Sequence, residues 1–118
     1  MPPRLDGLRG KTFRMPIEVL DSHIDELGHV NNQIYLNWFM KGAIEHSRSV
    51  GLGLEKYREM GGVFVVRRNE VVYHRPAHQG DRLVLETWST PVSRVQSRRH
   101  YELVREGDNR LIASGETD

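Results

Sequence analysis

The sequence contains no cysteine, and this absence excludes several chemistries at once. Disulfides, iron–sulfur clusters, thiolate zinc sites and cysteine nucleophiles all require the thiol group. A net charge of one sign is also lacking, because 17 Lys and Arg residues face 16 Asp and Glu residues and leave a formal charge of +1. A strong positive field is what proteins use to hold nucleic acid or anionic membranes. We therefore expect neither partner.

Long apolar runs are absent as well. No stretch approaches the roughly 20 apolar residues of a membrane span. The N-terminal MPPRLDGLRGK lacks the apolar segment of a signal peptide. These features predict a cytoplasmic protein. The 118 residues fit one small domain, which we divide into a flexible lead-in over residues 1–11 and a single domain over residues 12–118.

The first half of the domain combines a strand with a long helix. Apolar side chains alternate over residues 13–19, which predicts a strand, and Pro16 takes an outward position typical of a sheet edge. Large apolar residues then become so dense that a helix buried on most sides is expected from about Asn32 to Val50. Asn31 or Asn32 can cap its start with a side-chain amide.

The second half is rich in β-branched and aromatic residues and predicts strands. A short exposed helix over residues 53–61 leads into strand-like segments at 63–76 and 81–90. Residues 94–106 and 110–118 form a last hairpin around Gly-Asp-Asn, which supplies positive φ at the reversal. The fold class predicted is α+β, with a curved, five-stranded, mainly antiparallel sheet wrapped around one long central helix.

Polar groups are densest just ahead of the long helix, in DELGHVNN, residues 25–32. Asp25 lies in a loop, Gly28 allows a close backbone turn, and the helix start offers free N–H groups with the positive end of a dipole. A carboxylate beside such an oxyanion site suits the transfer of an acyl group to water. One alternative stays open at this point: Asp25, His29 and Asn31 merely satisfy the helix N-terminus.

Two segments resemble a known family. DELGHVNNQIYLNWF resembles the signature of hotdog-fold acyl-CoA thioesterases of the 4-hydroxybenzoyl-CoA thioesterase-like superfamily, and VVYHRPAHQGDRLVLETW is similar to a later strand, turn and strand of that family. The His-Val-Asn-Asn and Tyr pattern also resembles plant acyl-carrier-protein thioesterases. The resemblance runs from about Phe13 to the C-terminus. It implies the hotdog fold and hydrolysis of acyl-CoA or acyl-carrier-protein thioesters to the free acid, without a cofactor, in a tunnel between two subunits.

The resemblance also implies roles for single residues. Asp25 matches the catalytic carboxylate, as nucleophile or general base, and the backbone N–H of Asn32 matches the oxyanion donor. His29 and Asn31 would line the site or orient Asp25. Tyr35 would face the acyl pocket or the dimer seam, and plain core packing is its alternative.

Several arginines are candidates to bind the phosphates of coenzyme A, because guanidinium groups match phosphate oxygens. The candidates are Arg67 and Arg68, with Arg94, Arg98 and Arg99 as a second group. Their alternative is a role as charged strand residues that face water. The expected substrate-binding residues are thus Gly28, Tyr35, Arg67 and Arg68.

A metal site is not expected. His23, Asp25 and His29 are near one another in the chain, but their spacing matches no zinc motif. The chain also departs from the family at two places. Leu27 stands where the plant enzymes have Asn, so a triad that includes that Asn is not transferred. The sequence stops at GETD where relatives commonly continue with a Trp-Val segment, which leaves a shortened chain or a short last strand as alternatives.

Two further functions and an assembly state complete the expectations. A hotdog dehydratase or hydratase acting on acyl thioesters and a non-catalytic acyl-thioester-binding protein are the alternatives to the hydrolase, because a fold does not determine function. A domain this small has a thin core and its sheet has open edges, which predicts a homodimer or homotetramer.

Overall fold

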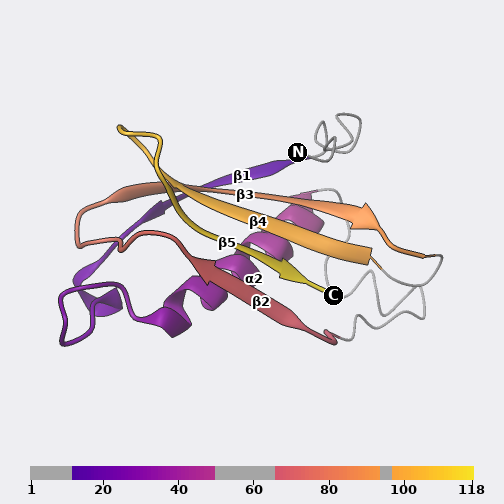
Figure 1. Cartoon of the computed structure of the whole chain (residues 1–118). Helices are drawn as coiled ribbons and strands as arrows, with labels where there is room; N and C mark the ends of the chain where they lie inside the picture. The colour runs from indigo at the N-terminus through magenta and orange to yellow at the C-terminus, as the bar shows by residue number, and fades with distance from the viewer. Residues whose placement is uncertain (1–11, 50–65, 94–96) are drawn as a thin grey trace.

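One long helix lies across a five-stranded antiparallel sheet (Figure 1). The computed structural model of the chain describes residues 12–49, 66–93 and 97–118. The elements in chain order are β1 (Phe13–Glu18), the 3-10 turn η1 (Asp21–His23), α2 (Asn32–Ser49), β2 (Asn69–Tyr73), β3 (Arg82–Pro91), β4 (Ser97–Arg105) and β5 (Leu111–Thr117). The α+β class and the element order predicted from the sequence are confirmed.

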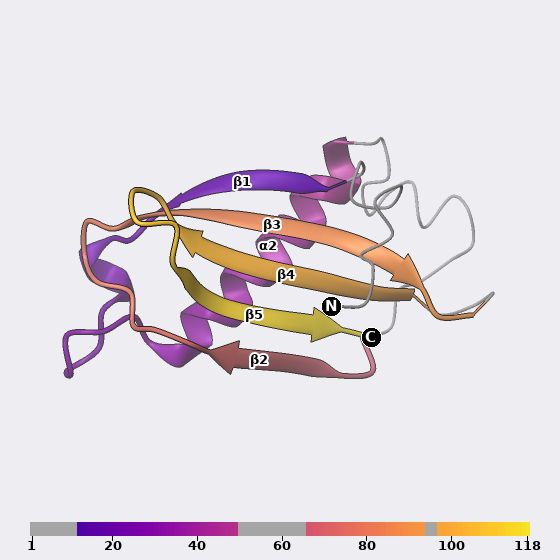
Figure 2. The same cartoon turned by 45° about the horizontal axis from the view of Figure 1, so that its top comes forward.

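The strands lie in the order β1-β3-β4-β5-β2, and Figure 2 shows them side by side in that order. All neighbours are antiparallel. Strands β1 and β2 are therefore the two edges. Pro16 lies exposed on β1, as expected for an edge strand. The last hairpin turns at Gly107 and Asn109, whose φ angles of 102° and 59° confirm the positive φ predicted there.

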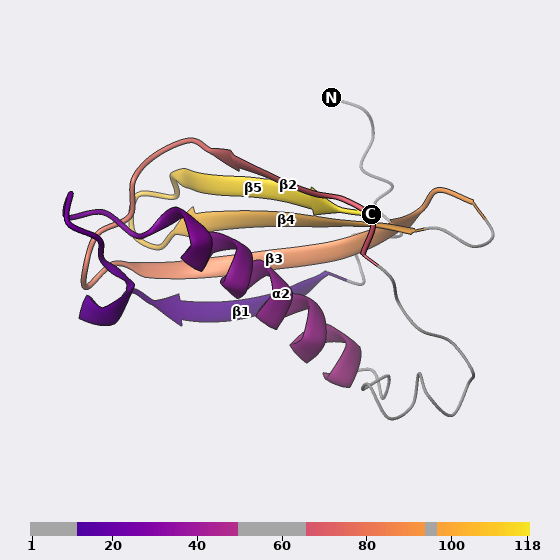
Figure 3. The same cartoon turned by 90° about the horizontal axis from the view of Figure 1, so that it is seen from below.

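Helix α2 covers one face of the sheet and crosses it diagonally from the side of β2 toward β1 (Figure 3). Its buried residues are Tyr35, Trp38, Phe39 and Gly42. Ile44, in contrast, is 45% exposed. The expectation that the helix is buried on most sides is thus wrong for the single chain, because the sheet covers only one side of α2.

Small residues allow the helix to approach the sheet closely. Phe39 stacks on Tyr101 of β4, with the ring centroids 4.6 Å apart. A Cβ atom on Gly115 would lie 2.8 Å from the ring of Phe39, and one on Gly42 would collide with the side chain of Leu85. The apolar core therefore lies between α2 and the three central strands, and this hotdog arrangement is the one that the resemblance implies.

Some expectations fall on residues that the structure does not describe. These are the lead-in over residues 1–11, the short helix over 53–61, the first part of the strand expected at 63–76, the last residue of the expected helix and Arg94. In the described ranges, no helix has both the length and the apolar character needed to cross a membrane.

Candidate functional site

A tight loop joins η1 to α2 and carries the polar residues singled out in the sequence. Its ends are held together by a β-bridge between Ile24 and Val30. The N–H of Asp25 donates to the carbonyl of His29 at 2.8 Å, and the N–H of Gly28 donates to the carbonyl of Asp25 at 3.0 Å. Gly28 has a φ of 79°, a left-handed conformation that glycine adopts without steric cost. The loop thus has one well-defined shape.

The carboxylate of Asp25 is oriented by the backbone of its own loop. Its Oδ1 accepts from the N–H of Leu27 at 2.9 Å and from the N–H of His29 at 3.4 Å. Among the described residues, no donor contacts its second oxygen. The side chain is half-buried. One oxygen therefore fixes the carboxylate, and the other is available for chemistry.

The first turn of α2 leaves one backbone donor free. Asn31 is the cap: its Oδ1 accepts from the N–H of Gln33 at 2.9 Å, and its carbonyl accepts from the N–H of Ile34 at 2.9 Å. The N–H of Asn32 has no acceptor in the part of the chain that the structure describes. The capping alternative is therefore correct for Asn31, and it leaves the N–H of Asn32 as the free donor at the positive end of the helix dipole.

Two tyrosines contact each other at the first turn of α2. Tyr35 is buried, and its ring lies 5.4 Å from that of Tyr73 and 5.6 Å from that of Trp38, edge to face in both cases. Burial raises the pKa of Tyr35, and a hydrogen bond with the backbone of Ala77 opposes this shift. The hydroxyl of Tyr73 donates to the carbonyl of Asn32 at 3.4 Å. Sequence reasoning missed Tyr73, although it is the aromatic residue within VVYHRP.

The segment over residues 74–81 contacts the loop that carries Asp25. The N–H of Val30 donates to the carbonyl of Ala77 at 3.1 Å, and the rings of His29 and His78 meet edge to face at 5.4 Å. His29 is exposed. The loop that carries Asp25 is therefore braced by the segment that precedes β3.

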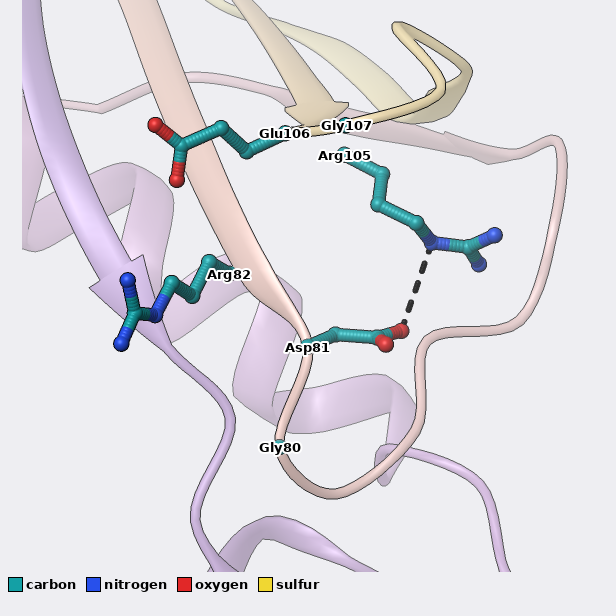
Figure 4. A pocket seen from close by; sticks show the side chains of 6 residues that line it. All are labelled: Gly80, Asp81, Arg82, Arg105, Glu106 and Gly107. Atoms are coloured by element: carbon teal, nitrogen blue, oxygen red, sulfur yellow. Dashed lines mark ion pairs between the residues drawn. The ribbon is translucent and has the colours of Figure 1, made fainter.

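A pocket of about 370 Å³ lies between the end of this segment and the end of β4 (Figure 4). It is lined by Gly80, Asp81, Arg82, Arg105, Glu106 and Gly107. Figure 4 shows Arg105 reaching toward Asp81, with Nε and Oδ2 3.4 Å apart. Arg105 also donates to the carbonyl of Pro76 at 2.8 Å. Its role in the structure is to fasten the segment over residues 74–81 to the end of β4.

The structure does not bring the predicted phosphate-binding arginines to Asp25. Arg68 lies just before β2, at the opposite end of that strand from Tyr73, and contacts Asp118 at 2.9 Å and Glu116 at 3.0 Å. Two further arginines of the second group are also engaged in the chain. Arg98 binds Asp118 at 2.7 Å, and Arg99 contacts His46 and Thr87. The other candidate residues lie together in the loop and the first turn of α2, whereas Arg67 and Arg68 lie at the far end of β2. These other candidates are Asp25, Gly28, His29, Asn31, Asn32 and Tyr35. In the described ranges, no three His, Asp or Glu side chains gather closely enough to hold a metal ion.

Comparison with known proteins gives a family and two curated relatives. A family model described as the thioesterase-like superfamily matches residues 19–118. The acyl-acyl carrier protein thioesterase ATL2 of Arabidopsis thaliana is 28% identical over 94 residues, which are 75% of this chain and 50% of that protein. ATL3 of the same plant is 26% identical over 84 residues, or 70% and 44% of the two chains. The chain thus spans about half the length of these curated relatives.

Solved structures share the fold. A 1,4-dihydroxy-2-naphthoyl-CoA thioesterase from Synechocystis superposes with a TM-score of 0.82 at 23% identity, over 90% of this chain and 78% of that one. A hypothetical protein from Aquifex aeolicus gives 0.80 at 24% identity, over 89% and 82%. At this level of identity, the likeness concerns the fold alone.

Proposed function

The chain belongs to the thioesterase-like superfamily, and from this premise we propose that it hydrolyses acyl-CoA thioesters to the free carboxylic acid and CoA. One observation carries the proposal: a carboxylate with a free oxygen, Asp25, and a free helix N–H, that of Asn32, belong to the same short, rigid junction. Acyl transfer to water requires these two groups, one to form the new bond and one to receive the negative charge.

The reaction needs water and no cofactor. In the general-base route, Asp25 takes a proton from water while the water oxygen bonds to the thioester carbon. In the nucleophilic route, the Asp25 oxygen bonds to that carbon, the C–S bond breaks to give an anhydride and the CoA thiolate, and water then hydrolyses the anhydride. In both routes the N–H of Asn32 donates to the developing oxyanion. In the general-base route, the C–S bond breaks when this oxyanion collapses, and the CoA thiolate takes up the proton that Asp25 removed from water. In the nucleophilic route, the thiolate takes up a proton from solvent.

The neighbouring residues have supporting roles in this scheme. Gly28 gives the loop the conformation in which the loop N–H groups hold Asp25. Because Gly28 has no side chain, it leaves room for the substrate. His29 lines the exposed mouth of the site beside His78. Tyr35 forms an aromatic wall below the helix start.

The carrier of the acyl group has a second candidate. ATL2 and ATL3 act on acyl-acyl carrier protein, according to their names. The thioester and the phosphopantetheine arm are common to both carriers, so the Asp25 and Asn32 chemistry suits either one. An acyl-carrier-protein substrate is therefore the alternative that the test must include.

The active assembly is proposed to be a homodimer formed through β2, or a tetramer built from such dimers. Strand β2 is an edge with exposed apolar side chains, among them Val72 at 42% and Tyr73 at 49%. The other edge, β1, carries Pro16, which discourages pairing. Edge-to-edge pairing of β2 around a twofold axis would extend the sheet and cover these side chains.

This pairing gives Arg67 and Arg68, which lie far from Asp25 in their own chain, a role in the site of the second copy. Antiparallel pairing of β2 with a second copy sets the start of one strand beside the end of the other. Arg67 and Arg68 of the second copy would then lie near Tyr73 and the helix start of the first. We propose that they contact the phosphates of the substrate there, across the subunit boundary.

The experiment measures free thiol released from short, long and aromatic acyl-CoAs, and from an acyl-acyl carrier protein, with a thiol reagent. The protein has no cysteine and adds no background. Asp25→Asn keeps the size of the side chain and its hydrogen bonds to the loop but removes the charge. We expect hydrolysis by the wild type and a loss of at least about a hundredfold in kcat in the variant, with binding retained.

Other results identify other functions. Thiol release from the carrier protein alone identifies the alternative substrate. Substrate binding without thiol release by the wild type rejects the hydrolase, and turnover of enoyl or hydroxyacyl thioesters would then identify a hydratase or dehydratase. Equal thiol release by the wild type and Asp25→Asn rejects Asp25 as the catalytic group.

A further inference from the structure

Tyr73 connects the sheet to the helix start, and its hydroxyl has no role in the reaction scheme above. We propose that Tyr73 is a positioning residue, which holds the first turn of α2 so that the N–H of Asn32 stays aimed at the oxyanion. The inference rests on the proposed function and deepens it, because it names a further residue that supports the oxyanion donor.

One peptide unit at the helix start is held by hydrogen bonds on both of its sides. The peptide group between Asn32 and Gln33 is held on both sides: its N–H donates to Oδ1 of Asn31 at 2.9 Å, and its carbonyl accepts from the hydroxyl of Tyr73 at 3.4 Å. This peptide shares the Cα atom of Asn32 with the preceding peptide, whose N–H is free. Fixing one peptide plane limits the rotation of the other.

Tyr73 is itself held by its strand pairing and by a ring contact. Its backbone pairs with Ala113 of β5, so the residue belongs to the sheet. Its ring contacts the ring of Tyr35 edge to face, at 5.4 Å. Tyr35 is 3% exposed and is anchored to the backbone of Ala77. The hydroxyl of Tyr73 is therefore presented from a rigid element, as the precise placement of a catalytic donor requires.

The hydroxyl of Tyr73 has a contact of its own, distinct from the packing of the ring. The side chain of Tyr73 is 49% exposed, so its hydroxyl is not required to fill the core. The carbonyl of Asn32 belongs to the first residue of α2 and takes part in the hydrogen bonding of the helix itself. The hydroxyl of Tyr73 is therefore an additional contact, made from another element to the peptide next to the free donor. The 3.4 Å separation is long for an O–H···O hydrogen bond, and the proposed role requires it to shorten when the substrate is bound, as catalytic hydrogen bonds often do.

Tyr73→Phe removes the hydroxyl and keeps the ring. We expect kcat to fall about three- to tenfold with a small change in KM, because one hydrogen bond is lost and it matters most in the transition state. The matched control is Tyr101→Phe, the same chemical change on β4, where the ring stacks on Phe39 in the core. We expect the kcat of this control to remain near the wild-type value.

A second readout does not depend on turnover. Amide hydrogen exchange followed by NMR should show faster exchange of the Gln33 N–H in Tyr73→Phe, by about three- to tenfold, because the peptide that it belongs to has lost its hydrogen bond to β2. Amides in the middle of α2, such as that of Lys41, should exchange at the wild-type rate. The same measurement on Tyr101→Phe should leave Gln33 unchanged.

The outcomes separate the two proposals. A fall in kcat together with faster Gln33 exchange supports the inference. Unchanged exchange in Tyr73→Phe overturns it, whether or not the protein hydrolyses thioesters. Normal kcat with faster exchange also overturns it, because the turn would then be held for stability alone. If the wild type releases no thiol, the proposed function is wrong and the inferred role in catalysis is overturned with it, even where exchange shows that Tyr73 holds the turn.

Discussion

The start of α2 shows how neighbouring residues of one type take different roles. Asn31 uses its side chain as a cap, and Asn32 offers only its backbone N–H. The side chain of Asn32 is exposed and makes no contact that the chemistry needs. The two asparagines should therefore respond differently to the loss of their amide groups.

Asn31→Ala should lower the free energy of unfolding by about 1 kcal/mol, because the N–H of Gln33 loses its acceptor. It should also lower kcat, since the first turn that presents the oxyanion donor becomes looser. Asn31→Asp keeps an acceptor and should restore most of the stability. Urea unfolding and thiol release measure the two effects.

The matched control at this site is Asn32→Ala, which keeps the backbone N–H. It should retain most of the stability and of kcat. A larger loss of stability in Asn32→Ala than in Asn31→Ala would contradict the assignment of Asn31 as the cap.

The single-residue features that the sequence predicted are local ones. A cap lies within three residues of the N–H that it binds, so the pattern of Asn31 ahead of an apolar segment is sufficient to suggest it. The link between Tyr73 and Asn32 joins residues 41 positions apart. Arg68 likewise meets Asp118 from 50 positions away. No local pattern in the chain reports which distant strand ends lie side by side.

At the scale of elements, the sequence pattern of β1 predicts which of its side chains are buried, whereas that of α2 does so only in part. The alternation in β1 corresponds directly to its inward and outward faces, because a strand of this sheet has one neighbour layer. The apolar density of α2 predicted a long helix in the right place along the chain, but it wrongly predicted that most sides of the helix are buried. Ile44 is 45% exposed, and no layer of the described residues covers it. Apolar content alone does not distinguish a core from an interface.

The outer face of the sheet contains a histidine that should make stability depend on pH. The ring of His100 on β4 stacks on Trp88 at 5.3 Å, and its Nε2 lies 2.8 Å from the hydroxyl of Thr90. Burial lowers the pKa of His100, Arg98 acts in the same direction, and Glu116 opposes them. The folded protein therefore binds this proton less readily than the unfolded chain does.

The sign of the effect follows from linkage. An unfolded histidine titrates near pH 6.5. Above that pH, both states are neutral and the full stability is present. As the pH falls below it, the unfolded state takes up the proton first, and the free energy of unfolding declines toward the pKa of the folded state. His100→Gln should therefore show a smaller decline between pH 7 and pH 5 in urea unfolding. Equal declines in the two proteins would contradict the direction of the shift.

At the scale of the whole molecule, the exposed apolar side of α2 and the open edge β2 both point to a second copy. The proposed catalytic groups of Asp25 and Asn32 come from one chain, whereas the arginines proposed to bind phosphate lie at the far end of β2. A twofold pairing of β2 resolves this separation without any change in the chain. The sequence predicted an oligomer from the small size of the core, but not which edge pairs, because edge identity depends on the strand order.

Val72→Lys tests the pairing, because a lysine in the middle of an edge strand opposes its extension by another strand. The wild type should have a light-scattering mass of twice the 13.7 kDa of one chain, or a higher even multiple for a tetramer. The variant should shift toward 13.7 kDa and lose thioester hydrolysis, because Arg67 and Arg68 of the second copy no longer reach the substrate. Glu18→Lys, on the opposite edge β1, is the matched control and should keep the wild-type mass and activity.

Circular dichroism of both variants shows whether the fold is retained. A wild type of 13.7 kDa at working concentration rejects the oligomer altogether. A Val72→Lys protein that keeps the wild-type mass places the interface elsewhere, and the exposed side of α2 then becomes the surface to vary. A folded Val72→Lys monomer with full activity would show that one chain holds the complete site, so that Arg67 and Arg68 have no part in binding the substrate.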